Sequence, residues 1–397
     1  MWGRIHPANP RERLSRLFGS GGEPGLVEAP GRVNLIGEHI DYHQLAVLPV
    51  ALDRRIRVAF RARNDSRIRA VSAGYGPREF EWTAHLAPVA RGDWENYLRA
   101  AAQAVAGRWG SGKGVDAVVE SRLPAAAGLS SSSALIVAFT LALLKANELE
   151  ASFAELMEIL PDGEQFVGTR GGGMDHAASL ESREGCASLV GFAPLSVRHI
   201  PVPAGWSFLV AHSLLTAEKS GSAREEYNLR RAGGATALAR LGFASYREAL
   251  PMALEAAARL DPGPERDAFL HVTSEALRVR AAVAAMESDD AAAFGRLLLE
   301  SHASLRDQLH VSCPALNHLV EAAMASGALG ARLTGAGFGG CVVVLCPATD
   351  RAAVRRGLVD RFYASRAGFD ERVHLIDVRP ANGALHLDSS AERPEKK

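Results

Sequence analysis

Short apolar stretches separated by glycine and proline dominate the N-terminal part of the chain. The segments 25–39, 46–62 and 67–73 each have the residue content of a β-strand. Apolar residues then recur at helical spacing from Trp94 to Val105, and segment 114–124 is strand-like again. The pattern therefore predicts a β-rich N-terminal segment followed by a helix and a further strand.

Helical and strand-like segments alternate along the rest of the chain. The four serines that end at Ser133 lead into ALIVAFTLALLKANEL, which predicts a buried helix, and MDHAASL predicts the start of another. GARLTGAGFGGCVVVLCP predicts a glycine loop that runs into a strand. The remaining segments are helices at 153–166, 223–241 and about 250–300, and strands at 187–196, 199–203 and 206–211.

These elements predict two α+β domains. The boundary is expected near residues 185–205, which gives an N-terminal domain over 1–195 and a C-terminal domain over 196–385. The polar end of the chain, residues 386–397, is predicted to be a disordered tail. The glycine loops are expected to meet between the two domains.

Composition narrows the class of partner. The 397 residues include 45 Lys plus Arg and 45 Asp plus Glu, so the formal net charge is zero, and no global field favours nucleic acid or an anionic membrane. The longest apolar run, Ala134 to Leu144, is shorter than the ~20 residues of a membrane-spanning helix. MWGRIHPANPRER lacks the apolar core of a signal peptide, and four cysteines without a CxxC pair indicate reduced thiols. We therefore expect a cytoplasmic protein that binds neither nucleic acid nor membrane.

The serine-rich loop PAAAGLSSSSA is the first candidate site. Small residues let backbone N–H groups approach a ligand, and the N-terminus of the predicted helix carries unpaired donors and partial positive charge. Phosphate binding is therefore one interpretation. The other is that one serine caps the helix and the rest are spacers, although four consecutive serines exceed what a cap requires.

A second glycine stretch imitates a nucleotide-binding loop. GRWGSGKG, from Gly107 to Gly114, fits the G-x4-G-K pattern but has glycine where a Walker A loop needs Ser or Thr for Mg²⁺. The segment before it is helical in pattern rather than strand-like. We interpret it as a surface turn.

The segment APGRVNLIGEHIDY gathers charged residues around a short apolar strand. It places Arg32, Glu38, His39 and Asp41 close together, and carboxylates accept hydrogen bonds from neighbouring hydroxyls, which suits recognition of a polyol. A solvated turn and a metal site are the alternatives. The residues alone do not decide among the three.

The loop GGGMD is the third candidate. Asp175 follows three glycines, and Glu164 lies on the preceding predicted helix. An acid after a flexible loop can enter a cleft and deprotonate a hydroxyl or stabilise a cation. Taken alone, Asp175 is equally compatible with a helix N-cap.

Together these segments resemble the galactokinase family of the GHMP small-molecule kinases. APGRVNLIGEHIDY is similar to the galactokinase signature, GLSSSSAL to the family's ATP loop, GGGMD to its catalytic-aspartate loop and LTGAGFGGC to its third glycine motif. GDWENYL, EYNLRR and SLRDQLHVSCPAL match as well. The resemblance implies an N-terminal domain like ribosomal protein S5 domain 2, a ferredoxin-like C-terminal domain, and transfer of phosphate from ATP to the C1 hydroxyl of a sugar.

The resemblance also implies roles for single residues. Asp175 matches the catalytic aspartate that takes the proton from the C1 hydroxyl, and Arg32 matches the arginine that keeps this aspartate ionised and stabilises the transferred phosphoryl group. The implied Mg²⁺ ligands are Ser132 and Glu164. The implied sugar-binding positions are Glu38, His39, Ile40, Asp41, Gly172 and Tyr227. The implied ATP-binding positions are Ser72, Ala126, Ala127, Gly128, Leu129, Ser130, Ser131 and Ser132.

Several residues bear on which sugar is the acceptor. Ile40, the fourth serine at Ser133 and the sequence GTRGGGMD favour the N-acetylgalactosamine-kinase-like branch. After Tyr42, typical galactokinases carry Asn-Asp-Gly, whereas this chain has His43, Gln44 and Leu45.

The function expected from the sequence is a monomeric galactokinase. N-acetylgalactosamine kinase is the first alternative, and a non-catalytic sensor of galactose and ATP is the second. The uninterrupted serine loop, with both Arg32 and Asp175 present, argues against the sensor. An isoprenoid alcohol or homoserine as acceptor is disfavoured, because GEHIDY supplies carboxylates and an imidazole that suit a polyol.

Overall fold

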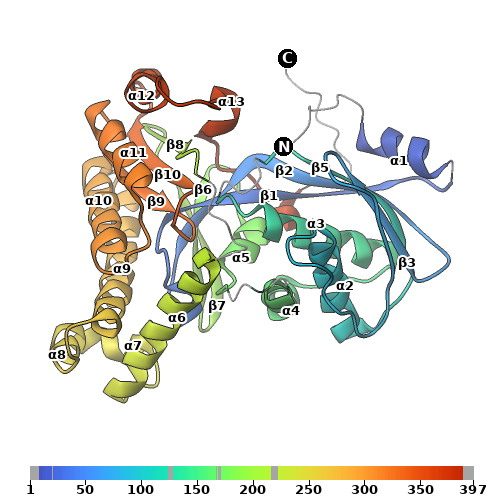
Figure 1. Ribbon diagram of the computed structural model, residues 1–397, viewed down its shortest axis with the longest axis horizontal. Coiled ribbons are helices and arrows are strands. Elements are labelled where there is room, and N and C mark those ends of the chain that lie inside the picture. Colours follow the sequence, from blue (N-terminus) through green and yellow to red (C-terminus); the bar gives the residue numbers. More distant parts are fainter. Residues whose placement is uncertain are drawn as a thin grey trace.

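The computed structural model describes residues 9–19, 21–123, 128–166, 168, 171–215 and 222–387. Two α+β halves lie next to each other along the long axis of the molecule, with the N-terminal sheet at one end and the long C-terminal helices at the other (Figure 1). Both halves mix strands and helices, as the sequence pattern predicts.

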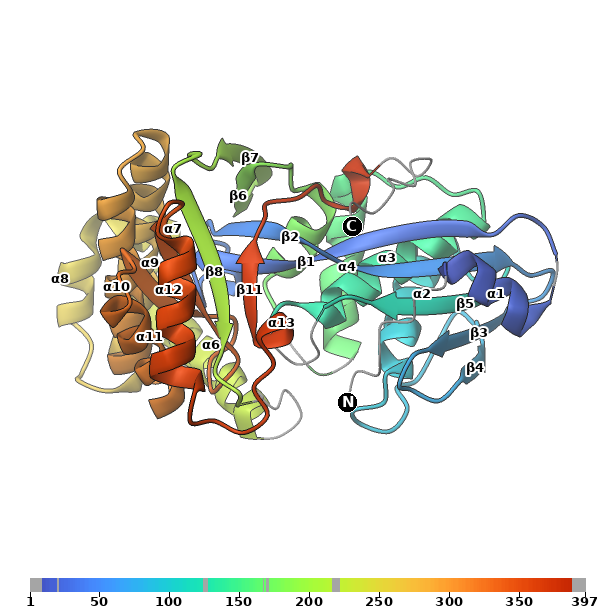
Figure 2. The same cartoon turned by 90° about the horizontal axis from the view of Figure 1, so that it is seen from above.

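The N-terminal half is built on a five-stranded sheet in the order β1-β2-β5-β3-β4. Neighbouring strands are antiparallel except β3 and β5, which are parallel. Viewed from above, β1 and β2 extend along most of the sheet (Figure 2). The strands are β1 (Gly25–Ile36), β2 (Leu48–Ala62), β3 (Arg67–Ser72), β4 (Arg78–Glu81) and β5 (Val115–Ser121).

Helices cover both faces of this sheet. Successive strand residues point to opposite faces, so Val58 of β2 joins the main core, whereas Ala59 packs with Leu14 and Val118 under helix α1. Helices α2 to α5 gather against the main core, where α3 and α5 pack directly on β1 and β2. The helices are α1 (Pro10–Phe18), α2 (Glu95–Trp109), α3 (Ser131–Ala146), α4 (Phe153–Phe166) and α5 (Met174–Glu181).

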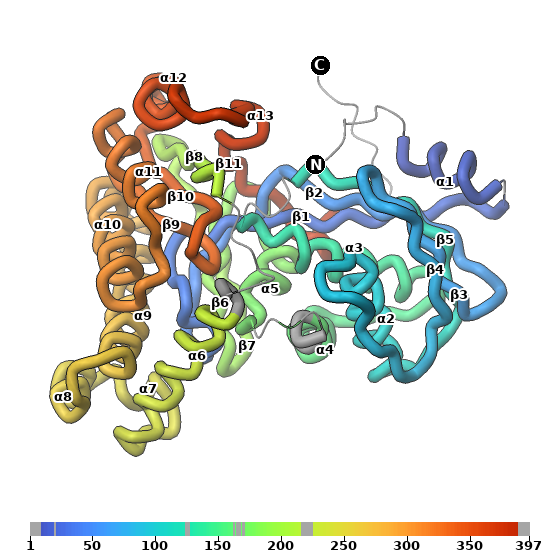
Figure 3. Tube along the Cα trace, in the orientation of Figure 1, coloured from blue at the N-terminus to red at the C-terminus, as the bar shows by residue number. Residues whose placement is uncertain are grey.

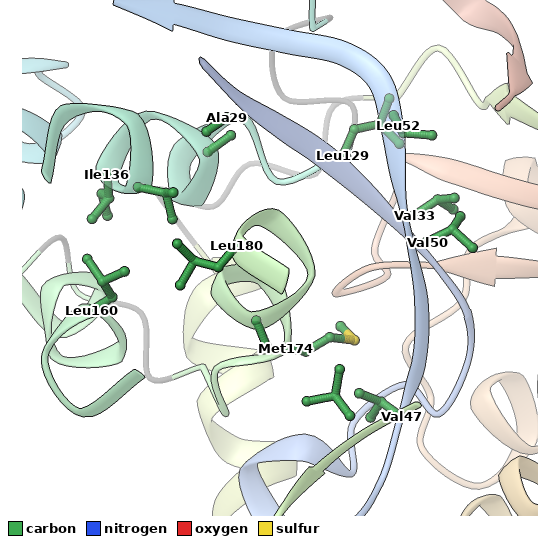
Figure 4. Close-up of a cluster of buried hydrophobic side chains, with 14 of the residues drawn as sticks. Ala29, Val33, Val47, Val50, Leu52, Leu129, Ile136, Leu160, Met174 and Leu180 are labelled. Atoms are coloured by element: carbon green, nitrogen blue, oxygen red, sulfur yellow. The ribbon is translucent and has the colours of Figure 1, made fainter. Parts of the chain in front are cut away.

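Helix α3 is apolar on every side, which is the pattern of a buried helix. Figure 4 shows Ile136 of α3 near Leu160 of α4 and Leu180 of α5, with Val33 and Val50 from the sheet in the same cluster. Burying each such side chain contributes about 1.5–3 kcal/mol. This packing fixes the N-terminal end of α3, where the serine loop ends.

A hairpin follows α5. Strands β6 (Cys186–Phe192) and β7 (Leu195–Pro201) pair antiparallel, and a bridge between Val47 and Val190 joins the hairpin to the start of β2. The domain boundary expected at residue 195 falls within this hairpin. The division of the chain into domains at that residue remains a prediction.

The C-terminal half contains a four-stranded antiparallel sheet in the order β11-β8-β10-β9. Every residue of β8 is buried, because Phe208 and Val210 face the core shared with the N-terminal half while Leu209 and Ala211 face a second core. The strands are β8 (Trp206–His212), β9 (Gly330–Thr334), β10 (Cys341–Pro347) and β11 (Leu375–Val378).

Helices enclose this second sheet, with α9 and α10 contributing to the shared core and α11 and α12 to the second core. The tube view follows the chain through them (Figure 3). The longer helices are α6 (Ser222–Leu241), α9 (Pro264–Glu287), α10 (Ala291–Asp307), α11 (Pro314–Ala325) and α12 (Arg351–Leu358). The shorter ones are α7 (Tyr246–Ala249), η2 (Leu250–Met252), α8 (Ala253–Ala258), η3 (Val359–Tyr363), α13 (Glu371–His374) and η4 (Ala384–His386).

The last described residues return to the N-terminal half. Gly383 N donates to Ser182 O, and His386 Nε2 of η4 lies 2.9 Å from Glu181 Oε1. The predicted tail begins at residue 386, and residues 388–397 lie outside the described part of the chain. In the described part of the chain, no helix combines the length and hydrophobicity needed to cross a membrane.

The stretch that imitates a Walker A loop connects a helix to a strand. Gly107 still belongs to α2, and residues 110–114 then lead into β5. A phosphate-binding loop of that type runs from a strand to a helix, so the order of elements is reversed here. This order agrees with the interpretation of the stretch as a surface turn rather than a nucleotide-binding loop.

Candidate active site

Asp175 lies in the first turn of α5, directly after the glycine loop. Gly173 adopts a positive φ of 99° at the N-cap, a conformation that glycine accepts at little cost. Arg32 of β1 meets the carboxylate, with Nε 2.6 Å and Nη2 2.5 Å from Asp175 Oδ1. The guanidinium thus stabilises negative charge at a position where the glycine loop, the sheet and α3 converge.

The serine loop contacts the same carboxylate from the other side. Ser130 Oγ donates to Asp175 Oδ2, and Ser133 Oγ lies 3.4 Å from the same oxygen. Ser130 therefore does not use its hydroxyl to cap α3, although it occupies the N-cap position with a left-handed φ of 55°. The interpretation of this serine as a side-chain cap is wrong, because its hydroxyl donates to Asp175 instead of accepting from a backbone N–H of α3.

Arg32 also fixes the backbone of the serine loop. Its Nη1 donates to Gly128 O at 2.8 Å, and its backbone N donates to Leu129 O at 3.2 Å. The first backbone bond within α3 is from Ala134 N to Ser130 O, so the N–H groups of Ser131 and the residues beside it have no partner inside the helix. An N-terminus of this kind is suited to a phosphate group next to Asp175.

The segment after β1 brings polar side chains to the same region. Asp41 opens a 3₁₀ turn, η1 (Asp41–His43), and its Oδ2 accepts a hydrogen bond from Gly172 N at 3.1 Å. A Cβ at Gly172 would lie 2.3 Å from the carbonyl carbon of Asp41, so only glycine fits. The segment that carries the predicted sugar-binding residues and the glycine loop before Asp175 are therefore in direct contact.

Asp41 is electrostatically unusual. Burial, followed by the nearby carboxylates of Asp175 and Glu38, raises the pKa of Asp41 from 3.8 to about 7. Perturbation by burial and by like charges is typical of functional sites. Near neutral pH this carboxyl group can therefore either donate or accept a hydrogen bond.

His39 and Tyr227 form an aromatic wall beside Asp41. His39 Nδ1 lies 2.8 Å from Tyr42 Oη and its Nε2 lies 3.2 Å from Ala336 O. Burial lowers the pKa of His39 to about 3, so the ring is neutral, with Nε2 donating to the carbonyl and Nδ1 accepting from Tyr42. Tyr227 of α6 packs against both rings, with centroids 5.1 Å from His39 and 5.7 Å from Tyr42.

Glu38 connects the two halves. Its Oε1 accepts from Gly335 N at 2.7 Å and Thr334 Oγ1 at 3.1 Å, and lies 3.0 Å from Arg332 Nη2. Arg332 Nη1 donates in turn to Leu35 O at 2.9 Å. The predicted sugar-binding glutamate is therefore also a joint between β1 and the third glycine motif.

Two other predicted site residues, Ile40 and Ser72, are buried in the structure. Ile40 is fully buried in the core, and its carbonyl accepts from His43 N and Leu45 N. Ser72 is buried in β3, where its backbone pairs with β5. Their proposed contacts with sugar and ATP remain predictions.

The predicted Mg²⁺ ligands are only partly described. Ser132 lies in the first turn of α3 and is half-buried, and its hydroxyl is an oxygen donor of the kind that Mg²⁺ accepts. Glu164 lies in α4, but its side chain is outside the described part of the chain, as are Ala126 and Ala127. Among the described residues, no group of three or more His, Cys, Asp or Glu side chains is arranged to hold a metal.

Sequence reasoning missed a buried polar group behind Glu38. Glu275 of α9 accepts from Gly37 N at 2.9 Å and Ser301 Oγ at 2.7 Å, and pairs with Arg278. Burial opposes ionisation of Glu275, but Arg278 and Arg332 outweigh it and lower its pKa to about 2. The available signal was a charged residue on the buried face of α9, which also carries His271 and Thr273.

Comparisons with known proteins agree with this geometry. Residues 12–62 match the galactokinase galactose-binding signature, residues 96–183 the GHMP kinases N terminal domain and residues 282–364 the GHMP kinases C terminal domain. A mevalonate kinase structure superposes with a TM-score of 0.62 at 16% identity over 90% of this chain and 99% of that one, a likeness of fold alone. The fold and the site thus define a GHMP kinase, a phosphotransferase that acts on small molecules.

More similar proteins narrow the class. The galactokinase of Streptomyces coelicolor is 38% identical over 383 residues, covering 95% of this chain and 97% of the relative, and that of Roseiflexus sp. is 36% identical over 360 residues, covering 89% and 91%. The structure of Lactococcus lactis galactokinase complexed with galactose superposes with a TM-score of 0.85 at 26% identity, covering 94% of this chain and 97% of that one. The chain belongs to the galactokinase family.

Proposed function

We propose that this protein transfers the γ-phosphoryl group of ATP to the C1 hydroxyl of D-galactose, giving α-D-galactose 1-phosphate and ADP. The observation that carries the proposal is the Arg32–Asp175 pair at the N-terminal end of α3. It joins a carboxylate able to accept a proton to a cation and a helix terminus able to stabilise phosphate oxygens.

Each group has a chemical task in this proposal. The C1 oxygen bonds to the γ-phosphorus, the bond from that phosphorus to the β,γ-bridging oxygen breaks, and the proton of the C1 hydroxyl passes to Asp175. Arg32 and the N–H groups at the start of α3 stabilise charge on the transferred phosphoryl oxygens, which is the main source of catalysis in a loose transition state. Gly172 and Asp41 hold the sugar-binding segment against the loop that carries Asp175.

Mg²⁺ is proposed as the metal that accompanies ATP. When bound, it would neutralise charge on the β- and γ-phosphates. Ser132 and Glu164 are its proposed ligands, because a hydroxyl and a carboxylate supply the oxygen atoms that this cation prefers.

The chain is proposed to act as a cytoplasmic monomer. ATP is its phosphate donor, and all four cysteines are free thiols. Arg32 and Asp175 from the N-terminal half and Thr334 and Gly335 from the C-terminal half meet around Glu38 and Asp41, so one chain supplies both sides of the candidate site.

The test is a coupled ADP-release assay with Mg-ATP and galactose, N-acetylgalactosamine, glucose or galacturonate at equal concentration. Turnover on galactose supports the proposal. Preference for N-acetylgalactosamine would favour that acceptor instead, and binding of galactose and ATP without ADP release would favour a sensor.

Asp175→Asn tests whether Asp175 accepts the proton of the sugar hydroxyl. It keeps the shape of the side chain but removes the proton acceptor, so kcat should fall by about 10²–10⁴-fold. Thermal unfolding of the variant should remain cooperative. A variant that keeps more than a tenth of the wild-type kcat would contradict the catalytic assignment.

A further inference from the structure

Three residues, His43, Gln44 and Leu45, follow the segment that carries the predicted sugar-binding positions. The structure separates them. Gln44 is exposed at the end of η1, with a left-handed φ of 60°, and Leu45 is buried in the hydrophobic core. Of the three, His43 is the residue whose ring contacts other aromatic side chains.

The ring of His43 lies between two tyrosines. Its centroid is 4.7 Å from that of Tyr42 at an interplanar angle of 71°, and 4.7 Å from that of Tyr246 at 53°. Tyr42 donates to His39, and both of those rings contact Tyr227. His43 is therefore connected to His39 and Tyr227 through Tyr42.

The same ring also sets the distance to α6, the helix that carries Tyr227. A Cβ built on Gly234 of α6 would lie 2.5 Å from His43 Nε2 and 2.9 Å from its Cε1. Tyr246 Oη donates to Gly234 O at 2.7 Å and so completes the contact from the other side. Because glycine weakens a helix interior relative to alanine, the contact with His43 gives a reason for glycine at this position.

Hydrogen bonding through Nε2 does not explain His43. Its Nε2 is enclosed and has no hydrogen-bond partner among the described residues. Burial and the nearby cation Arg231 keep the ring neutral, since they lower the pKa of His43 to about 3. What the residue contributes is the shape of its ring.

We propose that His43 is a positioning residue of the sugar site, which holds Tyr42 and sets the separation between η1 and α6 through its contact with Gly234. The proposal rests on the proposed sugar kinase function. It assigns His43 an effect on sugar binding and selectivity, while the ATP site at the start of α3 is left unchanged.

Gly234→Ala and Gly233→Ala form a matched pair of variants. Both substitutions place the same methyl group in α6, but a Cβ at Gly233 meets nothing closer than 3.9 Å. Gly234→Ala should displace the His43 ring and raise the galactose KM about tenfold or more, with the ATP KM within about twofold of wild type. Gly233→Ala should leave both KM values unchanged and increase the melting temperature.

Rescue separates positioning from general damage to the fold. His43→Asn removes the ring and should itself raise the galactose KM and alter the ratio of kcat/KM between galactose and N-acetylgalactosamine. In the double variant with Gly234→Ala, the shorter side chain leaves room for the new methyl group. The double variant should therefore bind galactose no worse than His43→Asn alone, so the two effects should not add.

The outcomes are distinct. If wild-type protein phosphorylates no sugar, the proposed function fails. If it does phosphorylate a sugar, two results would refute the role of His43. One is an equal galactose KM in Gly234→Ala and Gly233→Ala. The other is a rise of the ATP KM together with the galactose KM in Gly234→Ala. Should Gly234→Ala not fold, His43→Asn decides alone: a raised galactose KM supports the proposal and an unchanged one overturns it.

Discussion

Arg332 and Glu38 form an ion pair at 3.0 Å although their side chains are only 0% and 3% exposed. Arg332 belongs to β9 and Glu38 follows β1, so the pair joins the C-terminal half to the segment that carries the predicted sugar-binding residues. Thr334 and Gly335 bind the same Glu38 oxygen. A buried pair of this kind is weak evidence for net stability, but loss of one partner leaves an uncompensated buried charge.

Removing one partner of this pair should be costly. Arg332→Met leaves the Glu38 carboxylate buried without its cation, so the free energy of unfolding should fall by about 3–5 kcal/mol. Urea unfolding measures the loss. The control is Arg67→Ala, which breaks an ion pair with Glu79 in which both side chains are more than half exposed, and which should cost less than about 1 kcal/mol.

The double variant Glu38→Gln/Arg332→Met tests the reason for that cost. With the buried charge also removed, part of the lost stability should return. If Arg332→Met costs no more than Arg67→Ala, the pair does not join the halves as described.

The hydroxyl of Ser130 should contribute to catalysis by holding Asp175. A hydrogen bond to a charged group contributes about 1.5–3 kcal/mol, so Ser130→Ala should lower kcat by roughly 10- to 150-fold. Steady-state kinetics with galactose and Mg-ATP measure this. Ser288→Ala, which removes a hydroxyl at the C-terminal end of α9, should leave kcat unchanged. Equal kcat values for the two variants would show that Ser130 does not position the acid.

The sequence predicts most of the fold because the signals are local. Helix α3 follows from an uninterrupted apolar stretch after the serines, and the loop before Asp175 from three consecutive glycines. The fully buried β8 has the continuous apolar composition of a strand covered on both faces.

Long-range pairings were not predictable in the same way. Arg332 in GARLTGAG has the appearance of an ordinary exposed strand residue, and only the fold shows that it meets Glu38. The double role of Ser130 is similar: its position before a helix suggests a cap, but tertiary packing places Asp175 within reach of its hydroxyl. In each case, the partner comes from a distant part of the chain.

Gly172 should tolerate no side chain. The Cβ of Gly172→Ala would lie 2.3 Å from the Asp41 carbonyl carbon and from Tyr42 N, so the two loops would have to separate. The galactose KM should rise and kcat should fall together, because sugar and acid would lose their alignment. Gly107→Ala in α2 has no atom within 4 Å of its new Cβ and should keep both constants while it stabilises the helix. Unchanged kinetics in Gly172→Ala would contradict the close contact.

Buried histidines should make the protein sensitive to acid. Burial lowers the pKa of His39 to about 3 and those of His212, His271 and His302 to about 4, whereas the unfolded chain titrates near 6.5. Between these values the unfolded state binds more protons, so stability is lost as pH falls from about 6.5 towards 4. Urea unfolding at pH 7 and pH 5 measures the loss. His271→Gln should reduce the difference, and an unaltered difference would show that His271 does not contribute.

Titration of Asp41 should change the stability of the protein in the opposite direction, so that stability falls as pH rises. Its pKa in the folded protein is about 7, above the value of 3.8 for the unfolded chain, so the folded state holds the extra proton between these values. This contribution to stability is complete below pH 3.8 and is lost as pH rises through 7. Asp41→Asn removes the titration, so the variant should become more stable relative to wild type from pH 5 to pH 8, by an amount on the order of a few kcal/mol.

Comparing the variant with wild type at each pH cancels the contribution of the histidines, because both proteins contain them. The same substitution should weaken galactose binding, because the carboxyl group proposed to meet the sugar is replaced by an amide. Gained stability at pH 8 together with a raised galactose KM would be the trade-off expected of a residue kept for function rather than for folding. A stability difference that stays constant from pH 5 to pH 8 would instead mean that burial and the carboxylates of Asp175 and Glu38 do not raise the pKa of Asp41 to about 7.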